Sequence, residues 1–474
     1  MKKSFFTWKL AYDNSLDAFN PELWAQESLA ILEENMVIGR LVHRDFEPEI
    51  AKYGDVVNTR SIGEFGATRK DDRSNVTIQD ATATNIAVPL NQQIHTSFLI
   101  RDGEQSKSFK NLVEEYLQPA VLSIAQFIDK LLLGQHSSFI MSNVVGEFGN
   151  FTATNAKEQI LELRETMNIN KVPPNGRVLI LNPTAETAIL TDDAFTDADR
   201  VGDNGSALRE ASLGRRLGFD MFMCQNMATP TGGTTTAGAA DAAAAIGANL
   251  LPVAAAGDET IGHFVVVAGD AIPRRVYSVN TGVSISVHPP LREVMADTTV
   301  VTHYTQTNVN QGTASLDAGG TAAASGYRAG WHGPIAYDGG QVVVLGQIVA
   351  FGVGTTTAAL VAADEYYTVI AATSTTFTLD RPLAAAVADN AKVNLGPAGG
   401  YNLAFVKHAI AFVSRPLAIP MAGTGARAGV ANFNGLSIRV CITYDGNKQG
   451  HLVTVDLLCG VKPLSTARAA VLLN

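Results

Sequence analysis

Apolar residues recur with the spacing of a helix in two segments of the N-terminal third of the chain. The first segment opens with Asn20-Pro21, a pair typical of a helix start, and places apolar residues and glutamates on opposite faces as far as about Gly39. The second segment, Lys107–Leu133, carries one continuous apolar stripe and predicts a helix about 40 Å long, at ~1.5 Å per residue. Pro119 lies inside this helix, so we expect a bend or a local break there.

Between these two helices the pattern changes to a period of two, which indicates strands. Two alternating runs flank the charged segment Thr68–Ser74 and predict an extended β-hairpin loop over residues 51–105. The strands are rich in Thr, Asn and Gln, so the hairpin cannot bury much surface against its own domain. We therefore expect it to lie on a neighbouring subunit; a solvated tip that only raises solubility is the alternative. The residues expected in contacts between subunits are Trp24 of the first helix and Arg69, Lys70, Asp71, Asp72 and Arg73 of the tip.

Residues 141–224 alternate helix and strand patterns, which predicts an α/β region. Arg177–Leu181 is predicted to be a buried strand because its last four residues are apolar, and Asn182-Pro183 after it is typical of a helix start. We also expect helices at about Ala156–Met167 and Ala207–Gly214, an acidic loop over Asp192–Asp203, and a strand over Gly218–Cys224.

The composition changes at about residue 225, where the chain becomes rich in Ala, Gly and Thr and predicts only short strands and turns. A faint repeat lies within this region. Ile261–Val266 resembles Leu345–Ala350, and similar strands follow at 277–279 and 367–369. Two related β-units, or one barrel with a long excursion, would both account for the repeat.

The bulk composition limits the possible functions. Of the 474 residues, 46% are apolar and 17% are charged, and the formal net charge is −10 with no basic cluster. A protein that grips nucleic acid through phosphates would show clustered Lys and Arg, so tight DNA binding is not expected. Sparse charge instead indicates surfaces that partners cover. The apolar run near Met1 is too short for a signal peptide, and no stretch approaches the ~20 residues that cross a membrane.

No combination of residues predicts catalysis, a cofactor or a metal centre. The three cysteines lack paired spacing, which argues against disulfides and zinc, and the apolar strand contexts of Cys224 and Cys459 predict inert buried thiols. The aspartates of the Asp192–Asp203 segment lack the order of EF-hand ligands, so a solvated loop is favoured over a calcium site. There is no Gly-x-Ser-x-Gly elbow and no Walker lysine.

Several segments, taken in order along the chain, carry a family resemblance: Asn20–Ala25, Leu41–Phe46, Leu208–Asp220, Asn402–Phe412 with Arg415–Leu417, and Asp456–Val461. In this order they resemble the major capsid proteins of tailed bacteriophages with the Hong Kong 97-type fold. The resemblance is strongest to the P-twenty-two-type coat proteins, which carry an inserted β-domain. It covers the whole chain except much of residues 227–398, where only pattern and position agree.

The resemblance implies a mixed α+β fold made of six parts. The expected parts are an N-terminal arm (1–50), the extended loop (51–105), the spine helix of the peripheral domain (106–140), the first part of the axial domain (141–224), an inserted all-β domain on the outer surface (225–398), and returning axial and peripheral strands (399–474).

The resemblance also implies a function and partners. The chain would self-assemble into hexamers and pentamers of an icosahedral phage head in the virion, with scaffolding, portal and possibly decoration proteins as partners. Double-stranded DNA would be enclosed by confinement without specific binding, and no membrane, cofactor or metal would take part. Some relatives weld their shells through a Lys–Asn bond, but nothing beside Lys70 singles it out, so no cross-link is expected. A virion decoration or tail protein and an encapsulin-like compartment shell protein are the alternatives.

Overall fold

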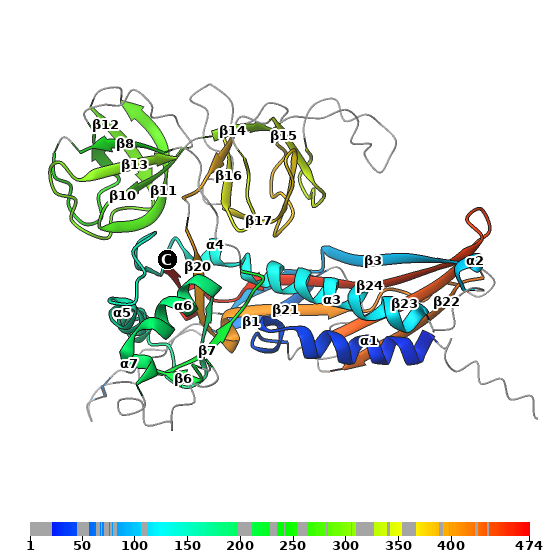
Figure 1. The fold of residues 1–474 in the computed structure, drawn as a ribbon. Helices are drawn as coiled ribbons and strands as arrows, with labels where there is room; N and C mark the ends of the chain where they lie inside the picture. Colours follow the sequence, from blue (N-terminus) through cyan, green and yellow to red (C-terminus); the bar gives the residue numbers. More distant parts are fainter. Residues whose placement is uncertain are drawn as a thin grey trace, which may run out of the picture. The chain divides into compact units, whose positions relative to one another are not determined.

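The computed structural model divides the chain into two compact units. The first lies within residues 1–35, 93–125 and 414–459, and the second within 36–92, 126–413 and 460–474. Helices and strands are mixed throughout (Figure 1), so the α+β prediction is confirmed. The residues that the structure describes are 21–44, 56–62, 67, 69–70, 75, 78, 83–105, 112–197, 211, 213–227, 235–240, 242–253, 263–280, 283–304, 306–309, 327–338, 342–352, 366–387, 392–397, 399–421, 425–433 and 436–474.

The first unit is built on an antiparallel sheet. The order of the sheet is β21-β24-β23-β22, with β3 paired to β24 on a separate side. A short helix, α2 (Asp102–Gln105), follows β3 directly. The strands of this sheet are β3 (Gln92–Arg101), β21 (Ile410–Arg415), β22 (Arg427–Phe433), β23 (Leu436–Asp445) and β24 (Gly450–Pro463). Residues 410–413 of β21 and 460–463 of β24 are counted with the second unit.

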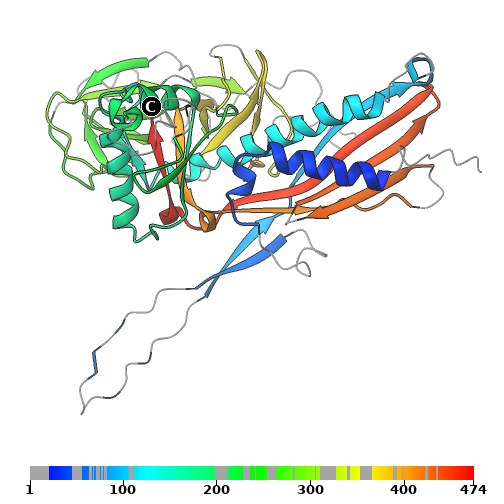
Figure 2. The same ribbon diagram turned by 60° about the horizontal axis from the view of Figure 1, so that its bottom comes forward.

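The helix α1 (Pro21–Asn35) packs on β22 and β23, and Figure 2 shows it in dark blue across these strands. Its buried residues Ala25, Leu29 and Leu32 are three or four positions apart, which places them on one face of the helix. Burying a leucine fully is worth about 1.5–3 kcal/mol, so this stripe decides which face of α1 meets the sheet.

The first helix ends earlier than the sequence predicted, at Asn35 and not near Gly39. The chain then passes into a short 3-10 helix, η2 (Ile38–Arg40). The buried carboxylate of Asp129 accepts the N–H groups of Val37 and Ile38, both at 3.2 Å, so these donors do not continue an α-helical ladder. The helix therefore stops because of a partner 91 or more residues away, which local periodicity does not contain.

The long predicted helix is α3 (Leu112–Leu133), and residues 106–111, where the prediction began, lie outside the described residues. A local break at Pro119, one of the two expected outcomes, does not occur because α3 continues through it, while a bend there stays a prediction. Pro119 is exposed, and water can satisfy the carbonyl group that the proline leaves without a donor. The first half of α3 contacts β3 through the Thr96–Ser123 hydroxyl pair at 3.0 Å and the Phe98–Tyr116 rings at 5.9 Å.

The second unit contains the predicted hairpin. Its strands β1 (Val56–Ile62) and β2 (Ala83–Pro89) are antiparallel, and the last pair of the register is Ile62 with Ala83. The connection between them is residues 63–82, which includes the charged tip. The prediction of a β-hairpin is confirmed for the strands, while most of the tip lies outside the described residues.

A six-stranded sheet forms the core of the α/β region, in the order β4-β25-β20-β5-β7-β6. It packs with the helices around one cluster that includes Ile160, Leu163, Leu179 and Leu472. The strands are β4 (Val144–Val145), β5 (Arg177–Leu181), β6 (Arg215–Arg216), β7 (Phe219–Met223), β20 (Tyr401–Val406) and β25 (Ala469–Leu473), and the helices are α4 (His136–Phe139), α5 (Ala156–Ile169), α6 (Pro183–Thr191), α7 (Asp193–Thr196), η3 (Lys407–Ala409) and η4 (Thr466–Arg468).

Most predictions for this region are confirmed. The strand at Arg177–Leu181 has the predicted bounds, and Asn182 caps α6 by accepting the N–H of Ala185 at 2.7 Å. The acidic loop is partly wrong, since Asp192 caps the short helix α7 through Ala194 N–H at 2.9 Å.

One further expectation for the α/β region needs correction. Residues 207–210 lie outside the described part, but the described end of that predicted helix is not helical, because Ala211 and Gly214 have φ of 52° and 54°. The returning strands divide between two sheets, since β20 joins the six-stranded sheet and β21 belongs to the sheet of β22–β24.

In the described part of the region after residue 225 there are two β-units of six strands each, drawn in green and in yellow in Figure 1. The first has the order β8-β13-β10-β11-β12-β9, and a bridge between Ala240 and Val253 joins the ends of its two outer strands. The second is a closed barrel. The strands are β8 (Thr235–Ala239), β9 (Leu250–Pro252), β10 (Phe264–Val267), β11 (Asp270–Asn280), β12 (Ser284–His288) and β13 (Val300–Tyr304), then β14 (Gln306–Val309), β15 (Ile335–Asp338), β16 (Ile348–Gly352), β17 (Tyr367–Ala372), β18 (Thr376–Leu379) and β19 (Lys392–Leu395).

The two β-units share one strand order. Around the barrel the second unit runs β14-β19-β16-β17-β18-β15, which is the order of the first unit with each strand replaced by its counterpart in chain order. A pairing outside the strands is also repeated. Ala244 and Met295 exchange both backbone hydrogen bonds, at 2.8 and 3.0 Å, and Tyr327 and Val387 do the same at 2.6 and 2.7 Å.

A glycine turn occurs at matching positions. Gly247 donates to Leu291 O at 2.7 Å and Gly330 donates to Leu383 O at 2.6 Å, with φ of 81° and 80°, a conformation that favours glycine. The two units therefore have the same backbone plan with separate apolar cores. Matching core residues include Val265 and Val349, Val276 and Val369, Ile285 and Phe377, and Val301 and Val393.

This arrangement settles the two alternatives for the repeat in favour of two related β-units. Phe264 and Ile348, at the same place in the first repeated segment, each begin a strand. The second repeated segment was aligned three residues out of register. Val276 donates to His263 O and Val369 donates to Gln347 O, so Val276 and Val369 are the equivalent residues.

Candidate functional site

The residues predicted for contacts between subunits lie at two places on the chain. Arg69 and Lys70 are described and exposed, whereas Asp71, Asp72 and Arg73 lie outside the described residues. Trp24 is part of α1, but its side chain also lies outside the described part. Their contacts therefore stay a prediction.

The hairpin is anchored at its base. Val57 and Val88 face each other in the register and are buried, while the Asn58–Asn85 side-chain bond, 3.1 Å long, is exposed. Lys462 Nζ donates to Ala87 O at 2.9 Å and ties β2 to the end of β24. Among the described strands β1 and β2 form hydrogen-bonded pairs only with each other.

The second β-unit contacts the turn between α3 and α4. We call this group of contacts the seat. Thr368 on β17 donates its hydroxyl to Gly134 O at 2.7 Å, and its N–H donates to the carboxylate of Asp380 at 2.8 Å. Gln135 also donates to Asp380, at 3.3 Å. Gly134 is required by close approach, since a Cβ there would lie 2.7 Å from the Cβ of Asp380.

Arg381 fixes the seat from the side of the barrel. Its guanidinium donates to Ser138 Oγ at 2.9 Å and to the carbonyl of Tyr366. Burial raises the pKa of the neighbouring Asp380 carboxyl, and the charge of Arg381 with the N–H of Thr368 only partly offsets this. The seat thus contains a carboxyl group whose charged form is disfavoured.

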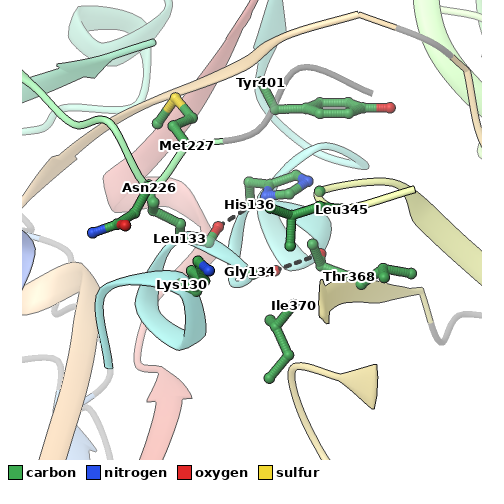
Figure 3. A pocket seen from close by; sticks show the side chains of 12 residues that line it. Lys130, Leu133, Gly134, His136, Asn226, Met227, Leu345, Thr368, Ile370 and Tyr401 are labelled. Carbon is green, nitrogen blue, oxygen red and sulfur yellow. Dashed lines mark hydrogen bonds between the residues drawn. The ribbon is translucent and has the colours of Figure 1, made fainter. Parts of the chain in front are cut away.

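His136 lies inside the seat. Its Nδ1 is 2.8 Å from Leu133 O, and its ring stacks on Tyr401 with centroids 4.6 Å apart and planes 20° apart. Figure 3 shows the imidazole between the Leu133 carbonyl and the Tyr401 ring. Burial lowers the pKa of His136 to about 4, so the ring is neutral at neutral pH.

The first β-unit meets the α/β region across an acidic cleft of about 580 Å³. The N–H of Gly269 donates to Glu147 at 3.0 Å, and Arg292 donates to the carbonyl of Ser142. Burial raises the pKa of Glu162 in the cleft wall, and the nearby carboxylates Glu165, Glu158 and Glu293 raise it further. Within the described residues no group of three or more His, Cys, Asp or Glu side chains is arranged to hold a metal ion.

In the first β-unit a buried ion pair on β11 binds the backbone at Arg292 and Glu293, and we call this contact the corner of the unit. Arg274, which is completely buried, lies 2.5 Å from the carboxylate of Asp270. The same carboxylate oxygen accepts the N–H groups of Arg292 at 2.7 Å and Glu293 at 3.2 Å. Burial alone would raise the pKa of Asp270, but the hydrogen bond and charge of Arg274, with these two N–H groups, lower it overall.

The second β-unit holds the matching corner without an ion pair. Tyr367 occupies the position of Arg274, two residues before the matched valine of each unit. Its hydroxyl oxygen accepts the N–H of Ala384 at 3.0 Å, and Ala384 follows Leu383 just as Arg292 follows Leu291. The equivalent N–H groups of Arg292 and Ala384 therefore bind different acceptors, a carboxylate in the first unit and a hydroxyl in the second.

The cysteines behave as the sequence predicted. Cys224 and Cys459 are buried and free, and burial raises the pKa of their thiols to about 11 and about 12. Such thiols are poor nucleophiles at neutral pH. No helix of the described part is long and apolar enough to cross a membrane.

Sequence reasoning missed the seat, the Asp270–Arg274 ion pair of the first β-unit and the Tyr367 hydrogen bond of the second. The segment Gly134-Gln135-His136 follows an apolar helix and carries no motif, and Asp380-Arg381 reads as an ordinary turn. The one available signal was the place of Asp270 and Arg274 in the mainly apolar run of residues 264–279, since charges within a buried strand are expected to be paired.

No family model matches the chain, and no curated protein sequence matches it. Solved structures similar to it include one from Mycobacterium phage Che8, with 13% sequence identity over 92% of this chain and 90% of that chain and a TM-score of 0.43. The capsid of cyanophage P-SCSP1u has 9% identity over 89% and 84%, with a TM-score of 0.42. The mature capsid of bacteriophage PhiM1 has 8% identity over 90% and 83%, with a TM-score of 0.40.

Proposed function

We propose that this chain is the major capsid protein of a tailed bacteriophage and joins copies of itself into the closed shell of the virion. The β1–β2 hairpin carries the proposal. Two-stranded hairpins are marginal in water, and Val57 and Val88, at the base, are the only buried side chains that the structure describes in these two strands. A surface on a neighbouring copy gives the remaining length a partner.

The charged tip supplies the polar part of this contact. Arg69 and Lys70 are exposed, and three more charged residues follow them in the sequence. An exposed ion pair contributes only about 0–1 kcal/mol. A closed shell repeats the same pair in every subunit, so weak pairs act together. Hexamers and pentamers of the chain are the assembly that we infer.

The partners follow from the charge and the layout of the chain. With a net charge of −10, the inner surface does not hold DNA tightly, and an adhesive lining would resist the sliding of packed DNA. We therefore infer that double-stranded DNA is confined without specific binding, and that scaffolding and portal proteins are the specific partners. Residues 225–398 form the insert, which we assign to the outer surface, where a decoration protein would also bind.

Sedimentation velocity and negative-stain electron microscopy of the purified chain, produced with its neighbouring gene products, test the proposal. Closed particles support it. Tubes or short rings would favour a tail protein, and shells filled with an enzyme in place of DNA would favour a compartment protein. A chain that remains monomeric under every condition would contradict self-assembly.

Charge reversal at the tip tests the proposed contact. We expect Arg69→Glu with Arg73→Glu to reduce the yield of assembled particles several-fold, because each reversed charge turns an attraction into a repulsion. The thermal transition of the free subunit should stay unchanged, since Arg69 is exposed. Lys157→Glu, an exposed lysine on α5, is the matched control. An unchanged yield in the double variant would remove the tip from the contact.

A further inference from the structure

A small cavity lies inside the seat of the second β-unit. Its volume is about 20 Å³, and side chains from both partners line it (Figure 3). Lys130, Gly134 and His136 come from the helix side, and Leu345 and Thr368 come from the barrel. The cavity therefore lies at the joint itself.

One polar atom on the wall of this cavity lacks a partner. His136 is 95% buried at 5% exposure, and no described protein atom forms a hydrogen bond with its Nε2. In Figure 3 this nitrogen is on the side of the ring away from the bond to Leu133. A buried polar atom without a hydrogen bond is destabilising, so a ligand at Nε2 stabilises the folded chain.

The tautomer defines the chemistry of that ligand. Leu133 O, 2.8 Å from Nδ1, can only accept, so the proton of the neutral ring is on Nδ1. Nε2 therefore presents a lone pair and binds a hydrogen-bond donor. Burial and, after it, the charge of Arg381 lower the pKa of His136, which disfavours a second proton on the ring.

The size of the cavity limits the donor to one small molecule. A water molecule needs a cavity of about 10–15 Å³ or more on this measure, together with two or more polar partners. Lys130, Asn226 and Thr368 also line the cavity, beside apolar residues such as Leu345 and Ile370. Cavities that stay empty in proteins are apolar throughout, whereas this one is lined in part by His136, whose Nε2 has no hydrogen bond.

We propose that the cavity holds a single ordered water molecule that donates a hydrogen bond to Nε2 of His136 and links the α3–α4 turn to the second β-unit. The water is thereby a structural part of the seat, alongside the direct bonds of Thr368 and Asp380. This site is independent of the proposed function, because it depends only on contacts within one chain.

A density map of the full chain at a resolution that shows ordered water tests the site. We expect one peak within hydrogen-bond distance of Nε2. We expect His136→Phe to lose this peak, while His408→Phe, a change at an exposed histidine, keeps it. A wild-type map with the cavity present and no peak, or with a protein atom bonded to Nε2, would overturn the proposal.

The protonation state gives a second measurement on the wild-type chain, which does not depend on a variant that folds. Nitrogen NMR of the full chain with labelled histidine should show the His136 ring protonated at Nδ1, and Nε2 as a hydrogen-bonded acceptor at neutral pH. A ring protonated at Nε2, or an Nε2 signal of an acceptor without a hydrogen bond, would exclude a donating water at this site.

Discussion

The two β-units that follow residue 225 have one backbone plan and hold the same corner in two different ways. In the first unit the carboxylate of Asp270, paired with Arg274, accepts the N–H of Arg292, and in the second the hydroxyl oxygen of Tyr367 accepts the N–H of Ala384. The backbone demand is the same, because each of these partly buried N–H groups needs an acceptor. The side chain that meets it is interchangeable.

The difference has an energetic consequence. A buried ion pair loses hydration on both partners, so its net contribution is small, yet removal of one partner leaves the other charge buried and unpaired. Loss of a neutral hydroxyl costs less stability, since it leaves only one N–H without an acceptor and no unpaired charge. We therefore expect the first unit to be far more sensitive than the second to a single substitution at the corner.

The largest effect should follow Asp270→Ala. Arg274 would remain fully buried without a counter-charge, and the first unit should lose about 3–5 kcal/mol of stability. Native-state hydrogen exchange of the amides in β10–β13 measures this locally in the full chain. The pair Asp270→Ala with Arg274→Tyr copies the neutral corner of the second unit and should recover more than half of the loss. A loss below 1 kcal/mol in the single variant would contradict an essential ion pair.

Gly134→Ala should have the next largest effect, and it acts on the second unit. The added Cβ would lie 2.7 Å from the Cβ of Asp380, and such overpacking costs about 1–3 kcal/mol. Faster exchange of the amides in β17 would report a loosened seat. Gly446→Ala, where a Cβ meets nothing within 4 Å, is the control. Gly134→Ala with Asp380→Gly should relieve the clash, and no relief would show that the strain lies elsewhere.

Tyr367→Phe should have a smaller effect than either. It removes the acceptor of the Ala384 N–H, which is 3.0 Å away, and should cost the second unit about 1–3 kcal/mol, at the lower end where water reaches the freed N–H. Exchange of the Ala384 amide is the direct readout. A loss as large as that of Asp270→Ala would refute the distinction between ionic and neutral corners.

The two units should also respond to pH in opposite directions. The pKa of Asp270 is lowered, so its stabilisation is present above the unfolded value of 3.8 and is lost as the pH falls through the folded pKa. The pKa of Asp380 is raised, so its stabilisation is present below 3.8 and is lost as the pH rises through the folded pKa. Asp270→Asn should reduce the loss of stability that the first unit shows as the pH falls. Asp380→Asn should reduce the loss of stability that the second unit shows as the pH rises above 3.8. Hydrogen exchange as a function of pH measures both. Equal slopes in wild type and variants would contradict this assignment.

The sequence predicted the elements better than it predicted the joints. Arg177–Leu181 and Asn182 were correct because a buried strand and a helix cap are encoded within a few neighbouring residues. The end of α1 was wrong because Asp129 lies more than 90 residues from the N–H groups that it binds. A hydrogen bond of that separation leaves no trace in local periodicity.

The repeat illustrates the same limit. The resemblance of Ile261–Val266 to Leu345–Ala350 located a true pair of strands, since apolar spacing is shared by both. The second half was three residues out of register, because Tyr-Ser-Val and Tyr-Thr-Val are common strand sequences and only backbone bonds to His263 and Gln347 fix the alignment. The repeat could not reveal the corner contacts, because the equivalent residues Arg274 and Tyr367 are chemically different, one a cation and the other a neutral hydroxyl.

A cryo-electron microscopy reconstruction of particles formed by the chain tests the account most directly. The account predicts a closed icosahedral shell in which the β1–β2 hairpin of each subunit lies on a neighbour and two six-stranded β-units per subunit stand on the outer surface. Particles without such a shell, or a shell in which the hairpin contacts only its own subunit, would contradict it.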